Sequence, residues 1–139
     1  MSKKTILDLV KNKKIKIGII GLGYVGMPLS LSFVNAGFKV IGFDIDKKKI
    51  KKIKRKESYI WSISSKNIDK ALSNGFEVTD DFSKIKIVDV IIVCVPTPLT
   101  KYGQPELKYL ISSVNSIKGF LKKGQLVSIE STTYPGTTE

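Results

Sequence analysis

The chain has 139 residues, which is enough for one domain core and excludes a second large one. Hydrophobic residues make up 42% of the chain and charged residues 26%, as in folded rather than disordered proteins. The 24 basic and 12 acidic residues give a net charge of +12, and the absence of histidine removes the commonest zinc ligand and the commonest general base.

Residues 1–14 form an N-terminal extension that we expect to be helical. Its apolar stretch is short and contains Asp8, unlike a signal peptide. The longest apolar run, residues 90–95, is far shorter than the ~20 residues that span a bilayer. The single cysteine, Cys94, cannot form an internal disulfide. We therefore expect a cytoplasmic protein without a membrane partner.

Residues 15–20 (IKIGII) form a short β-branched run that is typical of a buried strand. A helix is expected over residues 24–36, because apolar residues recur there at helical spacing and Gly37 follows as a stop signal. Its expected apolar stripe consists of Val25, Leu29, Phe33 and Ala36.

The next unit repeats this order of elements. Residues 38–43 (FKVIGF) predict a second strand that ends at Asp44, and Asp46 is placed to cap a lysine-rich helix with Ile50 and Ile53 on one face. A further helix is expected from Ser64 or Ser65 to residue 72, followed by a brief strand over residues 76–79.

In the second half, residues 80–81 begin a short turn or helix, and residues 88–95 (VDVIIVCV) predict a central parallel strand covered on both faces. A helix over residues 106–121 and a strand over residues 125–129 follow, and residues 131–139 predict a turn and the start of a helix. This alternation predicts an α/β fold for residues 15–139, a doubly wound parallel sheet in a three-layer αβα arrangement.

The first expected strand leads into a GxGxxG motif that opens a helix within a βαβ unit, which is the context of a Rossmann-type dinucleotide site. Gly21 permits a tight turn, Gly23 lets the backbone approach a pyrophosphate, and Gly26 allows close packing of helix on strand. The backbone N–H groups of Tyr24 and Val25, at the positive end of the helix dipole, are expected to bind the phosphates.

Asp44 follows the next strand and is placed to accept hydrogen bonds from the adenine ribose. A carboxylate there repels a 2′-phosphate, which favours NAD over NADP as the cofactor. The neighbouring lysines at residues 47–49 could pair with a 2′-phosphate and oppose this preference. Other interpretations are a flavin or S-adenosylmethionine site, or glycines that serve only the turn, with Asp44 as a cap.

Four segments carry a resemblance to a known family: IIGLGYVGMP at residues 19–28, VIGFDID at 40–46, VPTPLT at 95–100 and ESTTYPGTT at 130–138. Together they resemble the N-terminal NAD-binding domain of the UDP-glucose/GDP-mannose dehydrogenases, a family of nucleotide-sugar 6-dehydrogenases. The form ESTTYPGTTE and residues 98–107 are most similar to members that act on UDP-N-acetylhexosamines, notably UDP-N-acetylglucosamine.

The resemblance implies oxidation of the sugar C6 alcohol to a carboxylate with two NAD, for surface polysaccharide precursors. It implies a UDP-sugar substrate, a homodimer as the intact enzyme, and a nucleophilic cysteine, lysine and asparagine beyond this domain. We therefore expect this chain, as the N-terminal part of a longer enzyme, to be inactive alone. Cys94 lies in an expected buried strand and is not assigned as the nucleophile.

The resemblance also assigns roles to single residues. It places Tyr24 and Val25 in the pyrophosphate turn and Asp44 and Lys49 at the ribose. Thr97 of VPTP and Thr132 of the EST turn correspond to threonines at the nicotinamide end of the cofactor, with Thr132 in a supporting catalytic role near the reacting carbon. From the residues alone, turn capping is the favoured interpretation of both threonines.

Two other classes of function stay open. The chain could be a stand-alone NAD-sensing regulatory module. It could also bind nucleic acid through the lysine-rich segment at residues 47–56, although this segment has one arginine and no aromatic residue, which favours a solvated surface and no specific nucleic acid.

Overall fold

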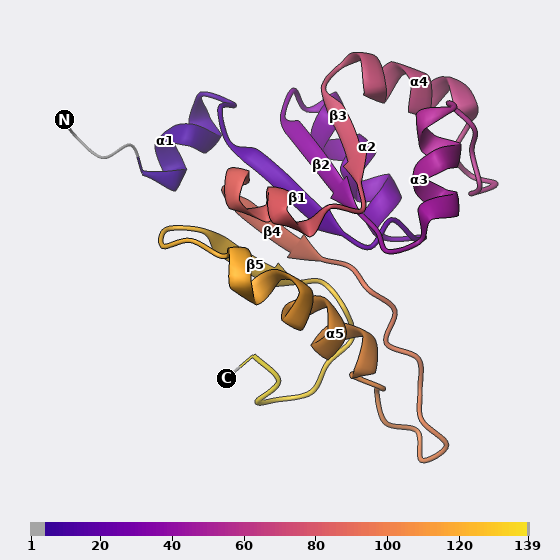
Figure 1. Ribbon diagram of the computed structural model, residues 1–139, viewed down its shortest axis with the longest axis vertical. Helices are drawn as coiled ribbons and strands as arrows, with labels where there is room; N and C mark the ends of the chain where they lie inside the picture. Colours follow the sequence, from indigo (N-terminus) through magenta and orange to yellow (C-terminus); the bar gives the residue numbers. More distant parts are fainter. Residues whose placement is uncertain (1–4, 139) are drawn as a thin grey trace.

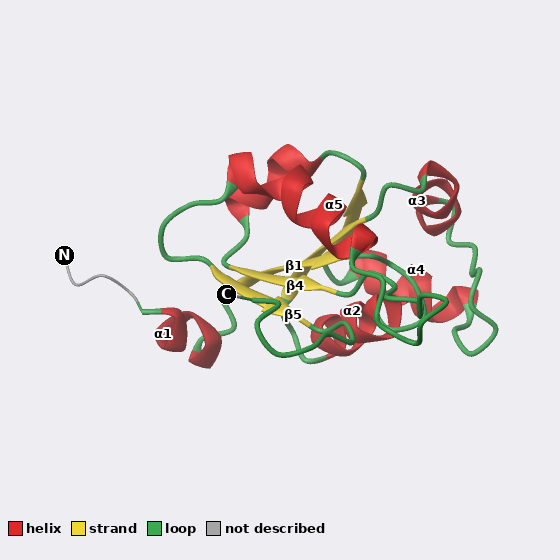
Figure 2. Ribbon diagram, turned by 90° about the horizontal axis from the view of Figure 1, so that it is seen from below, coloured by secondary structure: helices red, strands yellow, loops and turns green. Residues whose placement is uncertain are grey.

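The computed structural model describes residues 5–138, in which a five-stranded sheet lies between two layers of helices (Figures 1 and 2). The strands are β1 (Lys16–Ile20), β2 (Lys39–Phe43), β3 (Phe76–Thr79), β4 (Val90–Val93) and β5 (Leu126–Ile129). The α-helices are α1 (Ile6–Lys11), α2 (Gly26–Asn35), α3 (Lys47–Lys54), α4 (Ser65–Ser73) and α5 (Lys108–Ile117), and the 3-10 helices are η1 (Phe82–Ile87) and η2 (Lys118–Phe120).

The sheet is parallel throughout, with strand order β3-β2-β1-β4-β5. β1 lies at the centre, where Ile17 pairs with Val40 of β2 on one side and with Val90 of β4 on the other. The chain therefore builds outward from β1 in one direction and then from β4 in the other. This arrangement confirms the predicted doubly wound sheet and creates a switch point between β1 and β4, where such sheets bind ligands.

Side chains of the central strands alternate between two cores. Ile17 and Ile19 face the layer of α2, α3 and α4, whereas Ile20 and the β4 residues Ile91 and Val93 face α5 and η1. Figure 2 shows α5 on one side of the sheet and α2 and α4 on the other. Because both faces are covered, the central strands are apolar on both sides, as their sequences predicted.

Helix α2 presents to the sheet a face that is rotated from the one expected. Its fully buried residues are Gly26, Met27, Ser30, Leu31 and Val34. Of the predicted stripe, Leu29 and Phe33 are partly buried and pack against the core, whereas Val25 is 57% exposed and Ala36 is exposed. The predicted stripe was therefore wrong at Val25 and Ala36. Gly26 approaches the preceding turn closely, and this contact sets the rotation of α2 about its own axis. The residues spaced by four from Gly26 and from Met27 therefore face the core.

The C-terminal part departs from the expected elements in two places. Helix α5 ends at Ile117, before the expected end at residue 121, and it buries Leu110 and Ile117, while Ile111 is 58% exposed. Residues 131–138 form a turn instead of a helix start, because Gly136 adopts a positive φ of 88° that interrupts a right-handed helical path. Glu139 lies outside the described residues.

The N-terminal segment contains α1, which begins with a capping box between Thr5 and Asp8. Ile6 and Leu9 of α1 are partly buried and pack against the core. Residues 1–4 of the expected extension lie outside the described part of the chain. Across residues 5–138, none of the helices combines the length and the apolar composition that a membrane crossing requires.

Candidate functional site

A cavity of about 620 Å³ opens at the carboxyl ends of β1, β2 and β4, at the switch point of the sheet. Its walls come from the turn after β1, the turn after β2, the segment between α3 and α4, the turn after β4, and α5. The lining residues are Ile20, Gly21, Gly23, Tyr24, Val25, Phe43, Asp44, Ile45, Asp46, Lys49, Tyr59, Ile60, Phe82, Cys94, Val95, Pro96, Tyr109, Ser112, Ser113 and Ser116.

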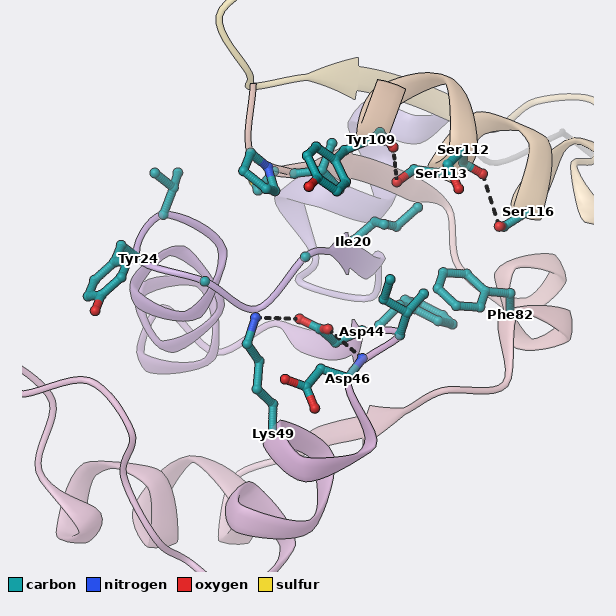
Figure 3. A pocket seen from close by; sticks show the side chains of 18 of the residues that line it. Ile20, Tyr24, Asp44, Asp46, Lys49, Phe82, Tyr109, Ser112, Ser113 and Ser116 are labelled. Atoms are coloured by element: carbon teal, nitrogen blue, oxygen red, sulfur yellow. Dashed lines mark hydrogen bonds and ion pairs between the residues drawn. The ribbon is translucent and has the colours of Figure 1, made fainter. Parts of the chain in front are cut away.

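Figure 3 shows two unlike walls across this cavity. Asp44, Asp46 and Lys49 lie on one side, and the serines of α5 with Tyr109 lie on the other. Ser113 donates a hydrogen bond to the carbonyl of Tyr109, and Ser116 donates one to the carbonyl of Ser112. The sequence did not predict this wall of serines, because serines within a helix do not indicate a binding site until the element that faces them is known.

The glycine turn after β1 is held by close backbone contacts. Gly21 has a φ of +92°, and a Cβ there would lie 2.8 Å from the carbonyl oxygen of Cys94. A Cβ on Gly26 would overlap the carbonyl oxygen of Gly21. Both positions therefore require glycine for reasons of packing and conformation, as the motif predicted.

Gly23 differs from these two glycines, because a Cβ on it would meet no atom within 4 Å. No packing reason within the described residues requires glycine there, so the missing side chain leaves room at the cavity wall. The N–H groups of Tyr24 and Val25 have no hydrogen-bond partner among the described residues, and they lie where α2 begins. Free amides, the positive end of a helix and an open approach fit a pyrophosphate group.

Asp44 is 6% exposed and lies at the cavity floor after β2. Its Oδ2 accepts a hydrogen bond from the Leu22 N–H at 2.8 Å and faces Lys49 Nζ at 3.4 Å, and its Oδ1 accepts from the Asp46 N–H at 2.9 Å. The carboxylate thereby joins the glycine turn to the start of α3. Figure 3 shows Lys49 extending toward Asp44, so the structure brings these two predicted residues together.

Tyr59 is a cavity residue that sequence reasoning missed. It lies between α3 and α4, and its hydroxyl donates a hydrogen bond to the carbonyl of Leu22 at 2.5 Å. Burial, and then the negative charges of Asp44 and Asp46, raise the pKa of this hydroxyl well above its usual range. Its segment has no periodicity that would point to the glycine turn, so only the tertiary contact reveals it.

Thr97 and Thr132 lie in the loops after β4 and β5, at the same edge of the sheet as the cavity. Neither is among the described residues that line the cavity. The two loops do meet, because the hydroxyl of Ser131 donates a hydrogen bond to the carbonyl of Val95 at 2.7 Å.

Cys94 follows β4 directly and is buried beneath the glycine turn. Burial, and then the charge of Glu130, raise the pKa of its thiol to about 11. A thiol that stays protonated at neutral pH is a poor nucleophile, which agrees with the exclusion of Cys94 from covalent chemistry.

The basic surface of α3 is partly paired with carboxylates. Lys47 lies 3.8 Å from Asp80, and Lys56, just beyond the helix, lies 2.9 Å from Asp69. Together with the pair of Lys49 and Asp44, these contacts occupy part of the surface on which a nucleic-acid interpretation depended.

Comparison with known proteins places this geometry in a family. Residues 15–139 match the NAD-binding domain of the UDP-glucose/GDP-mannose dehydrogenase family. The UDP-N-acetyl-D-glucosamine 6-dehydrogenase of Salmonella typhi is 39% identical over 126 residues, which cover 91% of this chain and 29% of that protein. The UDP-N-acetyl-D-mannosamine dehydrogenase of Pyrococcus horikoshii is 38% identical over 126 residues, which cover 89% of this chain and 30% of that protein.

The solved structure of a UDP-D-ManNAc dehydrogenase from Pyrococcus horikoshii superposes with a TM-score of 0.81 at 38% identity, over 89% of this chain and 30% of that structure. The chain spans 29% and 30% of the length of the two curated relatives described above. The match to an NAD-binding domain confirms NAD as the cofactor expected from the glycine turn and Asp44. The chain belongs to the UDP-glucose/GDP-mannose dehydrogenase family and contains its NAD-binding domain.

Proposed function

We propose that this chain is the cofactor domain of an NAD-dependent nucleotide-sugar 6-dehydrogenase that oxidises the C6 alcohol of a UDP-N-acetylhexosamine to the uronic acid. The observation that carries the proposal is the open glycine turn, in which the amides of Tyr24 and Val25 are free beside the buried carboxylate of Asp44. The substrate class is supported by relatives named as UDP-N-acetyl-D-glucosamine and UDP-N-acetyl-D-mannosamine dehydrogenases.

Each part of the turn has a distinct task toward the cofactor. Gly21 and Gly26 allow the tight backbone packing of the turn, and Gly23 leaves room for the pyrophosphate. The amides of Tyr24 and Val25 donate hydrogen bonds to the pyrophosphate. Bound NAD supplies a hydride acceptor for the oxidation of the alcohol.

The ribose end of the site depends on charge. Asp44 would accept hydrogen bonds from the ribose hydroxyls, and Lys49, which lies 3.4 Å from its Oδ2, would hold the carboxylate in place. The negative charges of Asp44 and Asp46 at the cavity disfavour the 2′-phosphate of NADP.

The nicotinamide end is assigned to Thr97 and Thr132, with Thr132 in a supporting role near the reacting carbon. Their loops lie at the carboxyl edge of the sheet next to the switch point, which supports this assignment. The UDP-sugar and the nucleophilic cysteine belong to parts of the enzyme outside this domain, and the intact enzyme is a homodimer.

We assign residues 15–139 to the NAD-binding domain and residues 1–14 to an N-terminal extension, a division supported by the family match over residues 15–139. A reducing cytoplasmic location suits the free buried thiol of Cys94 and a biosynthetic role in surface polysaccharide precursors. Among the described residues, no specific observation favours a stand-alone sensor or a nucleic-acid site.

The experiment that tests the proposal is a calorimetric titration of NAD into the wild-type chain and into Gly23→Ala. The new methyl group would meet no protein atom within 4 Å, so stability should be preserved, while NAD affinity should fall more than tenfold because the methyl group occupies the pyrophosphate approach. NADP should bind more weakly than NAD.

Gly119→Ala is the matched control, because a Cβ at Gly119 also meets no atom within 4 Å and Gly119 does not line the cavity. It should leave NAD affinity unchanged. Equal NAD affinity in the wild-type chain and Gly23→Ala, or no saturable NAD binding by the folded wild-type chain, would contradict the proposed site.

A further inference from the structure

The segment between α3 and α4 is fixed against the core and carries one side chain back to the glycine turn. Ile60 and Ile63 are buried at 4% and 7% exposure, and the Ser58 hydroxyl donates a hydrogen bond to the carbonyl of Ile60 at 2.9 Å. Tyr59 lies between these anchors and lines the cavity. Its position is therefore set by packing and is not that of a free surface loop.

Both backbone polar groups of Leu22, in the glycine turn, form hydrogen bonds to side chains. The Tyr59 hydroxyl donates to the Leu22 carbonyl at 2.5 Å, while the Leu22 N–H donates to Asp44 Oδ2 at 2.8 Å. These two contacts come from separate segments of the chain, because Tyr59 follows α3 and Asp44 follows β2. The Leu22 side chain is itself fully buried.

The carbonyl that Tyr59 holds belongs to the same peptide as the Gly23 N–H. In a trans peptide the C=O and N–H bonds point in opposite directions, so fixing one fixes the other. Gly23 has no side chain to restrict its backbone, and a Cβ there would meet no neighbour. The Tyr59 hydrogen bond therefore restricts the part of the turn that has the most conformational freedom.

We propose that Tyr59 is a positioning residue for the dinucleotide, whose hydroxyl fixes the Leu22–Gly23 peptide so that the turn amides are already oriented for the pyrophosphate. This inference depends on the proposed function, because it concerns the same cavity. Tyr59 acts through the backbone and needs no contact with the cofactor. Burial and the nearby carboxylates raise the pKa of the Tyr59 hydroxyl, so that it stays a protonated hydrogen-bond donor well into the alkaline range.

The test compares NAD, ADP and adenosine binding to the 139-residue chain and to Tyr59→Phe, which removes the hydroxyl and keeps the ring. Loss of one hydrogen bond that orients the turn should weaken NAD and ADP about three- to tenfold. Adenosine, which lacks the pyrophosphate, should bind both forms equally. Tyr102→Phe, which removes an exposed hydroxyl outside the cavity, should change none of the three affinities.

Replacement of Tyr59 by 4-aminophenylalanine restores a donor at the same position and should recover most of the NAD affinity. Equal NAD affinity in the wild-type chain and Tyr59→Phe would overturn the inference, as would an equal loss of affinity for adenosine. If the wild-type chain binds neither NAD nor ADP, the proposed function itself is refuted.

A measurement on the unmodified chain applies if Tyr59→Phe does not fold. ADP binding should slow the exchange of the Tyr59 hydroxyl proton with water in nuclear magnetic resonance spectra, because a bound pyrophosphate stabilises the oriented turn. Adenosine should not slow it. Hydroxyl exchange that is unaffected by ADP would overturn the inference.

Discussion

Asp44 is expected to stabilise the free protein as well as bind the cofactor. Its two carboxylate oxygens accept hydrogen bonds from the backbone N–H groups of Leu22 and Asp46, at 2.8 and 2.9 Å, in a site that is 6% exposed. Asp44→Ala removes both acceptors and leaves two amides without their charged partner. Asp44→Asn keeps one acceptor oxygen, but its NH₂ group then faces the other amide.

The size of the effect follows from these contacts. A hydrogen bond to a charged group contributes roughly 1.5–3 kcal/mol, so Asp44→Ala should lower the free energy of unfolding by about 3–6 kcal/mol. The Lys49 ion pair at 3.4 Å adds less than about 1 kcal/mol, because the lysine side chain is 34% exposed. For Asp44→Asn we expect about 2–4 kcal/mol, since one of the two acceptors remains.

Urea unfolding followed by circular dichroism measures these differences, and Asp80→Asn is the control. Asp80 is exposed and lies 3.8 Å from Lys47, so its loss should cost no more than about 0.5 kcal/mol. NAD titration of the Asp44 variants should show weaker binding. An unfolding midpoint for Asp44→Asn equal to that of Asp80→Asn would refute the view that Asp44 is a charged acceptor within the turn.

Three further predictions follow from single contacts. Gly26→Ala should lower the free energy of unfolding by about 3 kcal/mol or more, because its Cβ would overlap the Gly21 carbonyl oxygen; a thermal midpoint within about 2 °C of wild type would contradict this. Because burial raises the pKa of Cys94 to about 11, only about 1% of the thiol is ionised at pH 9, so iodoacetamide should label the folded chain at least tenfold more slowly than the urea-unfolded chain. Hydrogen bonds from the side chain and backbone of Ser83 lower the pKa of Asp81 below 3.8, so its stabilising effect is present above that pH and is lost as the pH falls through the folded-state pKa. The urea midpoints of wild type and Asp81→Ala should therefore converge as the pH falls from about 6 to about 2. Midpoints that stay equally far apart over this range would contradict a stabilising role of the ionised Asp81.

The predicted site residues fall into two groups, those predicted from a local sequence motif and those predicted only from their position after a strand. Gly21, Gly23 and Asp44 were predicted from motif spacing at strand ends, and the structure places all three at one cavity. This was possible because a parallel sheet brings the carboxyl ends of its strands to one edge. Thr97 and Thr132 follow the same rule for strand ends, but their side chains do not line the cavity, since loop length and direction are not set by strand position.

The sequence by itself determined the strands of the sheet, the glycine turn and the acid after β2, because buried strands and tight turns impose patterns on neighbouring residues. Only the tertiary structure decided which face of α2 is buried, and which side chain meets the carbonyl of Leu22. The contact of Tyr59 with Leu22 joins residues 37 positions apart. Such a contact depends on how Ile60 and Ile63 dock in the core, and periodicity carries no information about the packing of separate elements.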